Sequence, residues 1–368
     1  MGLAPASAVT TLGAKLAALI RANGPISVEA FMQHALYDPA HGYYRQRQPL
    51  GAAGDFITAP EISQMFGELI GLWCAERWLT SGQPVPCALI ELGPGKGTMM
   101  ADIVRASTKV PGFADASRLK LVETSPGLQR MQAARLPQAQ FHDRLADIAP
   151  GFSLIVANEF LDALPIRQFV RTSTGWRERG VGFENDSFTP LALTDPPDFA
   201  ALLPSAFHDA PQGAIFERNF AAEAVMAEIG QRIANDGGWA LLIDYGPAAP
   251  ALGETLQALR AHRPAPVFAA PGAHDLTAHV DFTAMARAAR EAGAAVFGPI
   301  SQGQLLERLG IDHRADALKR GQDARGRAAI EAARQRLIAP AQMGTLFKAI
   351  AVGPEGAAPP PGFEAAPS

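Results

Sequence analysis

Apolar and polar positions follow two different patterns along the chain. From about residue 10 to residue 79, apolar positions recur at helical spacing, with breaks at Asn23-Gly24-Pro25 and Asp38-Pro39. From residue 83 onward, short apolar runs of strand length alternate with stretches of helical character. These runs are residues 88–91, 119–123, 152–157 and 239–244. Strands that alternate with helices predict an α/β fold, with a mainly parallel sheet covered by helices on both faces.

The segment 168–216 interrupts this alternation. It is rich in Thr, Gly and Pro and carries short alternating runs, which predict a hairpin and loop inserted at the edge of the sheet. A helix at 220–233 then leads into the strand at 239–244, and residues 294–297 and 345–352 are candidates for the closing strands.

Three regions follow from these patterns. We expect an N-terminal helical region with a cofactor-covering loop at 1–82, and the sheet domain with its insertion at 83–352. The residues 353–368 are rich in Pro, Ala and Gly, a composition that predicts a disordered tail.

The strand predicted at 88–91 runs into the turn Gly93-Pro94-Gly95-Lys96-Gly97. Glycine adopts positive φ at little cost and has no Cβ to keep a ligand from the backbone, so this turn predicts a nucleotide-type cofactor. The P-loop pattern fails, because Gly97 stands where Ser or Thr is required and Ile90 replaces the first Gly. The dinucleotide fingerprint fails as well, since the third Gly comes one residue early. A tight strand-to-helix turn without a ligand is the alternative.

Pro94 favours S-adenosylmethionine (SAM) over a dinucleotide, because proline removes a backbone N–H that a pyrophosphate would use. The remaining amides at the helix start can hold the carboxylate of SAM, and Glu91 is placed for its ammonium group. Glu123, after the next predicted strand, can accept both ribose hydroxyls, a role common to nicotinamide and SAM enzymes. Asp143 stands where the following strand would end and is a candidate for the adenine amino group.

Asn158, Glu159 and Asp162 follow the fourth predicted strand. In open α/β sheets, ligands bind beyond the carboxyl ends of the strands, so we expect these three side chains to form the catalytic site. These two carboxylates and one amide suit a cationic acceptor, because no Lys or Arg lies between Asn158 and Arg167. In the alternative interpretation, Asp162 caps the turn that ends at Pro165 and Glu159 faces solvent.

A second candidate segment lies upstream. Thr58 and Glu61, with Pro60 between them, have the spacing of a capping box at a helix start. Helix capping does not account for Asp55 and Phe56, which we expect in a loop that folds over the cofactor.

Composition narrows the function classes. The net charge of −4 and the even spread of Lys and Arg disfavour a nucleic-acid partner, and no apolar run is long enough to span a membrane. Cys74 and Cys87 cannot build a disulfide framework, and the absence of a recognisable signal segment predicts a cytoplasmic protein. His274 and His279 flank Asp275, but their spacing is not that of a zinc site.

Taken together, the motifs resemble those of the MidA family of class I SAM-dependent methyltransferases. The resemblance covers about residues 26–352. It rests on the segments 54–63, 66–68, 91–98, 122–126, 157–165, 243–246, 255–258, 275–282 and 343–348.

The resemblance implies a Rossmann-like methyltransferase sheet with SAM as cofactor. The family includes mitochondrial assembly factors that methylate an arginine in a core subunit of respiratory complex I, so it implies a protein-arginine methyltransferase that assists assembly of that complex. Glu159 and Asp162 would then hold the guanidinium group. The implied location is the bacterial cytoplasm or, if the N-terminus has been trimmed, the mitochondrial matrix. The alternatives are a small-molecule methyltransferase, a non-catalytic assembly chaperone that binds SAM and, more distantly, a nicotinamide oxidoreductase.

Overall fold

The computed structural model describes residues 10–46, 58–194, 199–260 and 263–364. It divides into two compact units, each built from three separate segments of the chain. Unit 1 consists of Met1–Phe56, Asp162–Ala222 and Pro250–His279, and unit 2 of Ile57–Leu161, Glu223–Ala249 and Val280–Ser368. The predicted division of the chain into residues 1–82, 83–352 and 353–368 stays a prediction.

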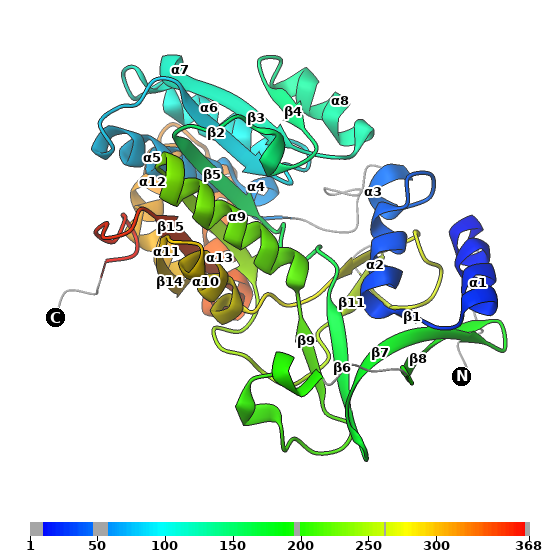
Figure 1. Cartoon of the computed structure of the whole chain (residues 1–368). Helices are drawn as coiled ribbons and strands as arrows, with labels where there is room; N and C mark the ends of the chain where they lie inside the picture. Colours follow the sequence, from blue (N-terminus) through cyan, green and yellow to red (C-terminus); the bar gives the residue numbers. More distant parts are fainter. Residues whose placement is uncertain (1–9, 47–57, 195–198, 261–262, 365–368) are drawn as a thin grey trace. The chain divides into compact units, whose positions relative to one another are not determined.

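Unit 2 is organised around a seven-stranded sheet in the order β14-β15-β10-β5-β2-β3-β4 (Figure 1). Its strands are β2 (Cys87–Leu92), β3 (Ser117–Val122), β4 (Gln140–His142), β5 (Ser153–Asn158), β10 (Gly238–Tyr245), β14 (Ala295–Ser301) and β15 (Phe347–Gly353). Only β15 runs antiparallel to its two neighbours within this sheet. β5 and β10 are buried along their whole length, as expected for central parallel strands. The mainly parallel α/β sheet predicted from the sequence is confirmed.

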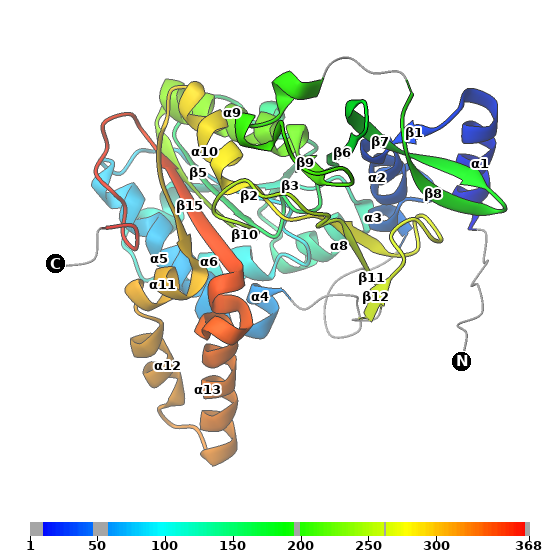
Figure 2. The same cartoon turned by 90° about the horizontal axis from the view of Figure 1, so that it is seen from below.

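Helices cover both faces of this sheet. Figure 2 shows α9 and α10 on one side and α5, α6 and α11 on the other. The helices of unit 2, including most of α9, are α4 (Ala59–Ile62), α5 (Gln64–Thr80), α6 (Thr98–Ser107), α7 (Phe113–Ala116), α8 (Pro126–Arg135), α9 (Phe220–Asp236), α10 (Phe282–Glu291), α11 (Gln302–Arg308), α12 (Ile311–Lys319) and α13 (Ala324–Ile338).

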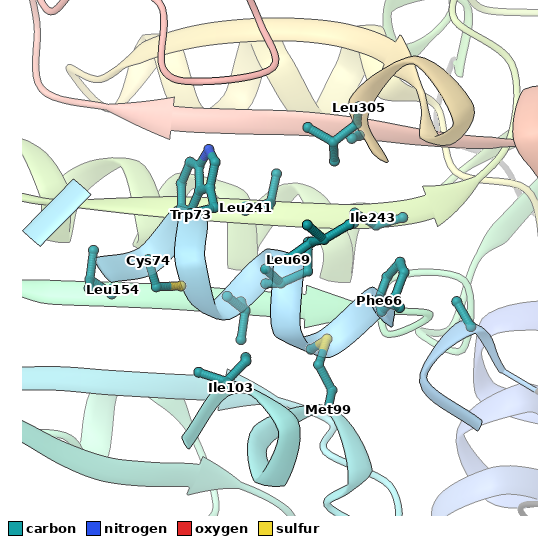
Figure 3. Packing of buried hydrophobic residues seen from close by; sticks show 14 of the residues in the cluster. Phe66, Leu69, Trp73, Cys74, Met99, Ile103, Leu154, Leu241, Ile243 and Leu305 are labelled. Carbon is teal, nitrogen blue, oxygen red and sulfur yellow. The ribbon is translucent and has the colours of Figure 1, made fainter. Parts of the chain in front are cut away.

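The main core lies under α5, whose Phe66, Leu69 and Trp73 pack with side chains from α6, β5, β10 and α11 (Figure 3). Glycines on α5 let α6 come close: a Cβ at Gly67 would lie 2.6 Å from the Cβ of Asp102, and one at Gly71 would lie 2.9 Å from a backbone atom of α6. α5 is therefore buried around most of its circumference.

The residues 354–364, the described part of the predicted tail, are packed within unit 2, in contrast to the disorder expected from their composition. Trp73 donates its indole N–H to the carbonyl of Pro361 at 3.2 Å, and Arg308 donates to the carbonyl of Gly362 at 2.9 Å. The ring of Phe363 is buried among core residues. The buried ring of Phe363 and hydrogen bonds from Trp73 and Arg308 order a stretch whose Pro and Ala content alone predicts disorder.

In its described residues, unit 1 contains three α-helices and two small sheets. The helices are α1 (Thr11–Asn23), α2 (Val28–Tyr37) and α3 (Tyr43–Gln46). The larger sheet has the order β1-β7-β6-β9, with β8 paired to β7, and the smaller has the order β12-β11-β13. Their strands are β1 (Ile26–Ser27), β6 (Arg167–Thr172), β7 (Gly175–Glu184), β8 (Ser187–Ala192), β9 (Ile215–Arg218), β11 (Gln257–Arg260), β12 (Arg263–Ala265) and β13 (Asp275–Thr277).

The strands β6, β7 and β8 form the antiparallel hairpins predicted for the insertion. They share unit 1 with the N-terminal helices, and Phe31 of α2 stacks edge-on against Phe188 of β8 at 5.7 Å between ring centroids. None of the helices in the described parts of the chain is long and apolar enough to cross a membrane.

Candidate cofactor and acceptor site

The turn after β2 has the backbone that its three glycines predict. Gly93, Gly95 and Gly97 have φ values of +62°, +53° and +74°, in the left-handed region that disfavours other residues. At Gly93 there is a second reason for glycine, since an added Cβ would lie 2.7 Å from the ring of Phe160. Gly97 is the residue directly before α6, so the turn ends on a helix N-terminus, where backbone N–H groups can bind an anionic group.

Glu91 is buried near the end of β2 and is 2% exposed. Burial raises the pKa of its carboxyl group to about 8, a backbone hydrogen bond from Met100 lowers it, and the charge of Glu123 raises it further. Among the residues that the structure describes, its Oε2 has no hydrogen-bond partner. A buried carboxyl with one unsatisfied oxygen fits a ligand that brings an ammonium group or a water molecule bound to one.

Glu123 follows β3 directly and is also buried. Its Oε1 accepts a hydrogen bond from the backbone N–H of Ser125 at 2.7 Å, and Gln129 of α8 donates to its carbonyl at 2.6 Å. The carboxylate is therefore held at the carboxyl end of the strand next to β2, the place where a ribose is expected.

Asp143 follows β4 directly and is exposed. The ends of β3 and β4 are joined there, because Glu123 donates its backbone N–H to the carbonyl of His142 at 3.0 Å. Asp143 therefore lies at the same edge of the sheet as Glu123, after the neighbouring strand β4. Asp55 and Phe56 lie outside the described residues.

Asn158 and Glu159 meet at the end of β5. Asn158 donates from Nδ2 to Oε1 of Glu159 at 3.0 Å, and the same oxygen accepts from the backbone N–H of Ala59 at 3.3 Å. Glu159 has a φ of +52°, which is uncommon for a residue other than glycine, and its backbone N–H is tied to the carbonyl of Ile243 at 3.0 Å. A strained, hydrogen-bonded, half-buried glutamate differs from the solvated one of the alternative interpretation.

Asp162 belongs to unit 1, where it is buried and its carbonyl accepts a hydrogen bond from the backbone N–H of Ala278 at 3.0 Å. The structure thus brings Asn158 and Glu159 together within unit 2. The pairing of Glu159 with Asp162 stays a prediction.

The predicted capping box before α5 is wrong for Thr58. Its side chain makes no capping hydrogen bond at the start of α4. Glu61 instead reaches the glycine turn, where Oε1 accepts from the hydroxyl of Thr98 and Oε2 lies 3.3 Å from Nζ of Lys96. Sequence reasoning missed this contact because local helix capping accounted for the spacing; the signal available was a Lys and a Thr within the turn itself.

The Nε2 of His274 contacts the carbonyl of Ala269. Across the described ranges, no group of three or more His, Cys, Asp or Glu side chains is arranged to hold a metal ion.

Three comparisons with known proteins bear on this site. A family described as "Putative S-adenosyl-L-methionine-dependent methyltransferase" matches residues 69–300. The mitochondrial protein arginine methyltransferase NDUFAF7 of Danio rerio is 36% identical over 364 residues, which covers 92% of this chain and 85% of that protein. The human protein of the same name is 36% identical over 327 residues, with 81% and 73% covered.

A crystal structure of a Burkholderia thailandensis protein bound to S-adenosyl-homocysteine (SAH) is also similar. It is 29% identical, superimposes with a TM-score of 0.81, and the match covers 96% of this chain and 93% of that one. The methyltransferase fold expected from the motifs is confirmed, and so is the resemblance on which it rested. The glycine turn, the unsatisfied oxygen of Glu91 and the strand-end Glu123 fit a SAM-type cofactor.

Proposed function

Since this chain belongs to that family of SAM-dependent methyltransferases, we propose that it methylates an arginine side chain of a protein. The observation that carries the proposal is the carboxylate of Glu159, which Asn158 and the backbone N–H of Ala59 hold at the end of β5. A carboxylate fixed beside the cofactor strand suits a guanidinium acceptor, which it can bind in a planar, bidentate manner. The relatives named protein arginine methyltransferases support the same acceptor.

We assign the cofactor as follows. Glu91 faces its ammonium end, the backbone of Gly93, Gly95 and Gly97 approaches its amino-acid part, and Glu123 accepts from its ribose. Asp143 is assigned to the adenine, and Asp55 and Phe56 to a loop that covers the cofactor. When bound, SAM would supply an electrophilic methyl group on a sulfonium centre, and the neutral thioether SAH would be the leaving group.

The residues of the chain contribute by positioning and by charge. Glu159, together with Asp162 in the proposed pair, orients the guanidinium and draws its positive charge away from the attacking nitrogen. Fixing two reactants in near-attack geometry can lower a barrier by about 7–11 kcal/mol, so orientation alone accounts for much of the expected rate.

The acceptor protein that we propose is a subunit of respiratory complex I, and methylation would assist its assembly. The cytoplasmic location expected from the sequence has no support in the comparisons, because the relatives are named mitochondrial proteins. Of the two predicted locations, we therefore propose the mitochondrial matrix.

Transfer from methyl-labelled SAM into cell extract tests the function directly. The labelled protein is hydrolysed and its amino acids are separated, and the expected product is labelled methylarginine. Label in lysine, or in a small molecule alone, would overturn the arginine proposal. SAM binding without any transfer would instead support the assembly chaperone. Isolated complex I subunits, added one at a time, then identify the acceptor.

A further inference from the structure

Gln132 of α8 is a fully buried polar side chain that joins two parts of the cofactor site. Its Nε2 donates to the carbonyl of Gly95 at 2.6 Å and to Oε2 of Glu123 at 3.3 Å. The two acceptor groups follow different strands: the carbonyl of Gly95 lies in the glycine turn after β2, and Glu123 comes directly after β3. A single amide group therefore spans the turn and the strand-end carboxylate.

The orientation of this amide follows from its partners. A carbonyl and a carboxylate can only accept, so the NH₂ end of the side chain must face both of them. This leaves the Oε1 of Gln132 buried, with no hydrogen-bond partner among the described residues. A buried, unsatisfied oxygen is unfavourable, and the two donated hydrogen bonds offset that cost.

α8 also fits the turn by shape. A Cβ at Gly97 would lie 3.4 Å from Cγ of Gln132 and 3.6 Å from a methyl of Leu136. The stem of Gln132 thus packs on the third glycine while its head holds the carbonyl of the second. At the other end of the helix, Ser125 holds Oε1 of Glu123, so the carboxylate is fixed from both of its oxygens.

We propose that Gln132 is a positioning residue for SAM, which sets the glycine turn and the carboxylate of Glu123 at the separation that the cofactor requires. It acts through these two groups and not on the methyl transfer itself. The inference rests on the proposed role of Glu123 in binding the ribose.

Replacement Gln132→Met keeps the length and volume of the side chain and removes both hydrogen bonds. Because hydrogen bonds to charged groups are worth more than neutral ones, we expect Kd for SAH and KM for SAM to rise by about 10-fold or more. The kcat at saturating SAM and the KM for the acceptor protein should stay within about twofold of wild type. A purely structural role would lower the melting temperature or the active fraction without changing Kd.

Arg130→Met is the matched control, because Arg130 is an exposed residue of α8, and within the described residues no hydrogen bond joins its side chain to the glycine turn or to Glu123. Its Kd for SAH should change by no more than about twofold. Equal losses in Arg130→Met and Gln132→Met would show a general effect of α8 and overturn the proposal.

Gln132→Glu adds a readout that depends on pH. Beside Glu123 and a carbonyl, the introduced carboxyl can donate only when protonated, so SAH should bind relatively tighter at pH 6 than at pH 8, compared with wild type. A ratio of variant to wild-type Kd that does not change with pH would contradict the proposed contact.

Glu123→Gln separates the two levels of inference. If it does not weaken SAH binding, the proposed cofactor site is wrong. If it weakens binding but Gln132→Met does not, the cofactor site stands and the positioning role of Gln132 is refuted.

Discussion

The cofactor half and the acceptor half of the proposed site are built in different ways. The cofactor half, from Glu91 to Glu123, lies within unit 2 and follows directly from two neighbouring strands. The acceptor half rests on Glu159 at the end of β5, whose carboxylate accepts hydrogen bonds from Asn158 and from the backbone N–H of Ala59, 100 positions away in the chain. The cofactor half is thus fixed by residues that adjoin two neighbouring strands, whereas the proposed acceptor carboxylate depends on a contact with a distant part of the chain.

The largest expected effect comes from the cofactor half, with Gly93→Ala. The change adds a Cβ to a residue with a left-handed backbone, and this Cβ would lie 2.7 Å from the ring of Phe160. Backbone strain of about 1–2 kcal/mol together with that clash predicts a fall in SAH affinity of about 100-fold. Isothermal titration calorimetry measures it.

Gly82→Ala is the control for this change. Gly82 also has a positive φ, +84°, but an added Cβ would meet nothing within 4 Å. It should cost about 1–2 kcal/mol of stability and leave SAH affinity unchanged. Equal losses of affinity in both variants would mean that the glycine turn has no special relation to the cofactor.

In the acceptor half, Glu159→Gln should reduce kcat by about 100-fold while Kd for SAH stays near wild type, because charge stabilisation of the reacting group is lost. Asp162→Asn should act in the same way. If the two carboxylates hold one guanidinium, the double variant will be little worse than either single one.

The outcome of that double variant decides the comparison between the two halves. Multiplicative losses would mean that Glu159 and Asp162 act independently and do not hold one guanidinium group. A loss of SAH affinity in Glu159→Gln would show that Glu159 binds the cofactor and not the acceptor.

The same contrast separates what the sequence predicts from what it does not. The strands and the glycine turn follow from apolar periodicity and from residues adjacent in the chain, and the structure confirms them. The contacts of Glu61 and Gln132 with the glycine turn join residues 35 and 37 positions apart, and no periodicity marks them. The docked segment around Phe363 is of the same kind, since its order comes from a distant helix.

A separate effect, on stability and not on SAH affinity, concerns Glu91 and pH. Burial raises the pKa of its carboxyl to about 8, so the folded protein keeps a proton that the unfolded chain releases near pH 4.5. The contribution to stability is therefore full below about pH 4.5 and is lost as the pH rises toward 8, by at most about 1.4 kcal/mol per pH unit. Urea unfolding of wild type and Glu91→Gln between pH 5 and pH 8 should show this slope in wild type alone. Parallel stability profiles would contradict a raised pKa.

The smallest expected effect is that of Glu61→Gln. Glu61 steadies the glycine turn through Thr98 and Lys96, and the pair with Lys96 is partly exposed, with side chains 22% and 20% accessible. Partly exposed ion pairs contribute little, so SAH affinity should fall by about threefold and should fall less at high salt. Glu76→Gln, which removes another ion pair of unit 2 away from the turn, should leave affinity unchanged. A loss in Glu61→Gln that is unaffected by salt would show that the hydrogen bond that Glu61 accepts from the hydroxyl of Thr98, and not the ion pair with Lys96, holds the turn.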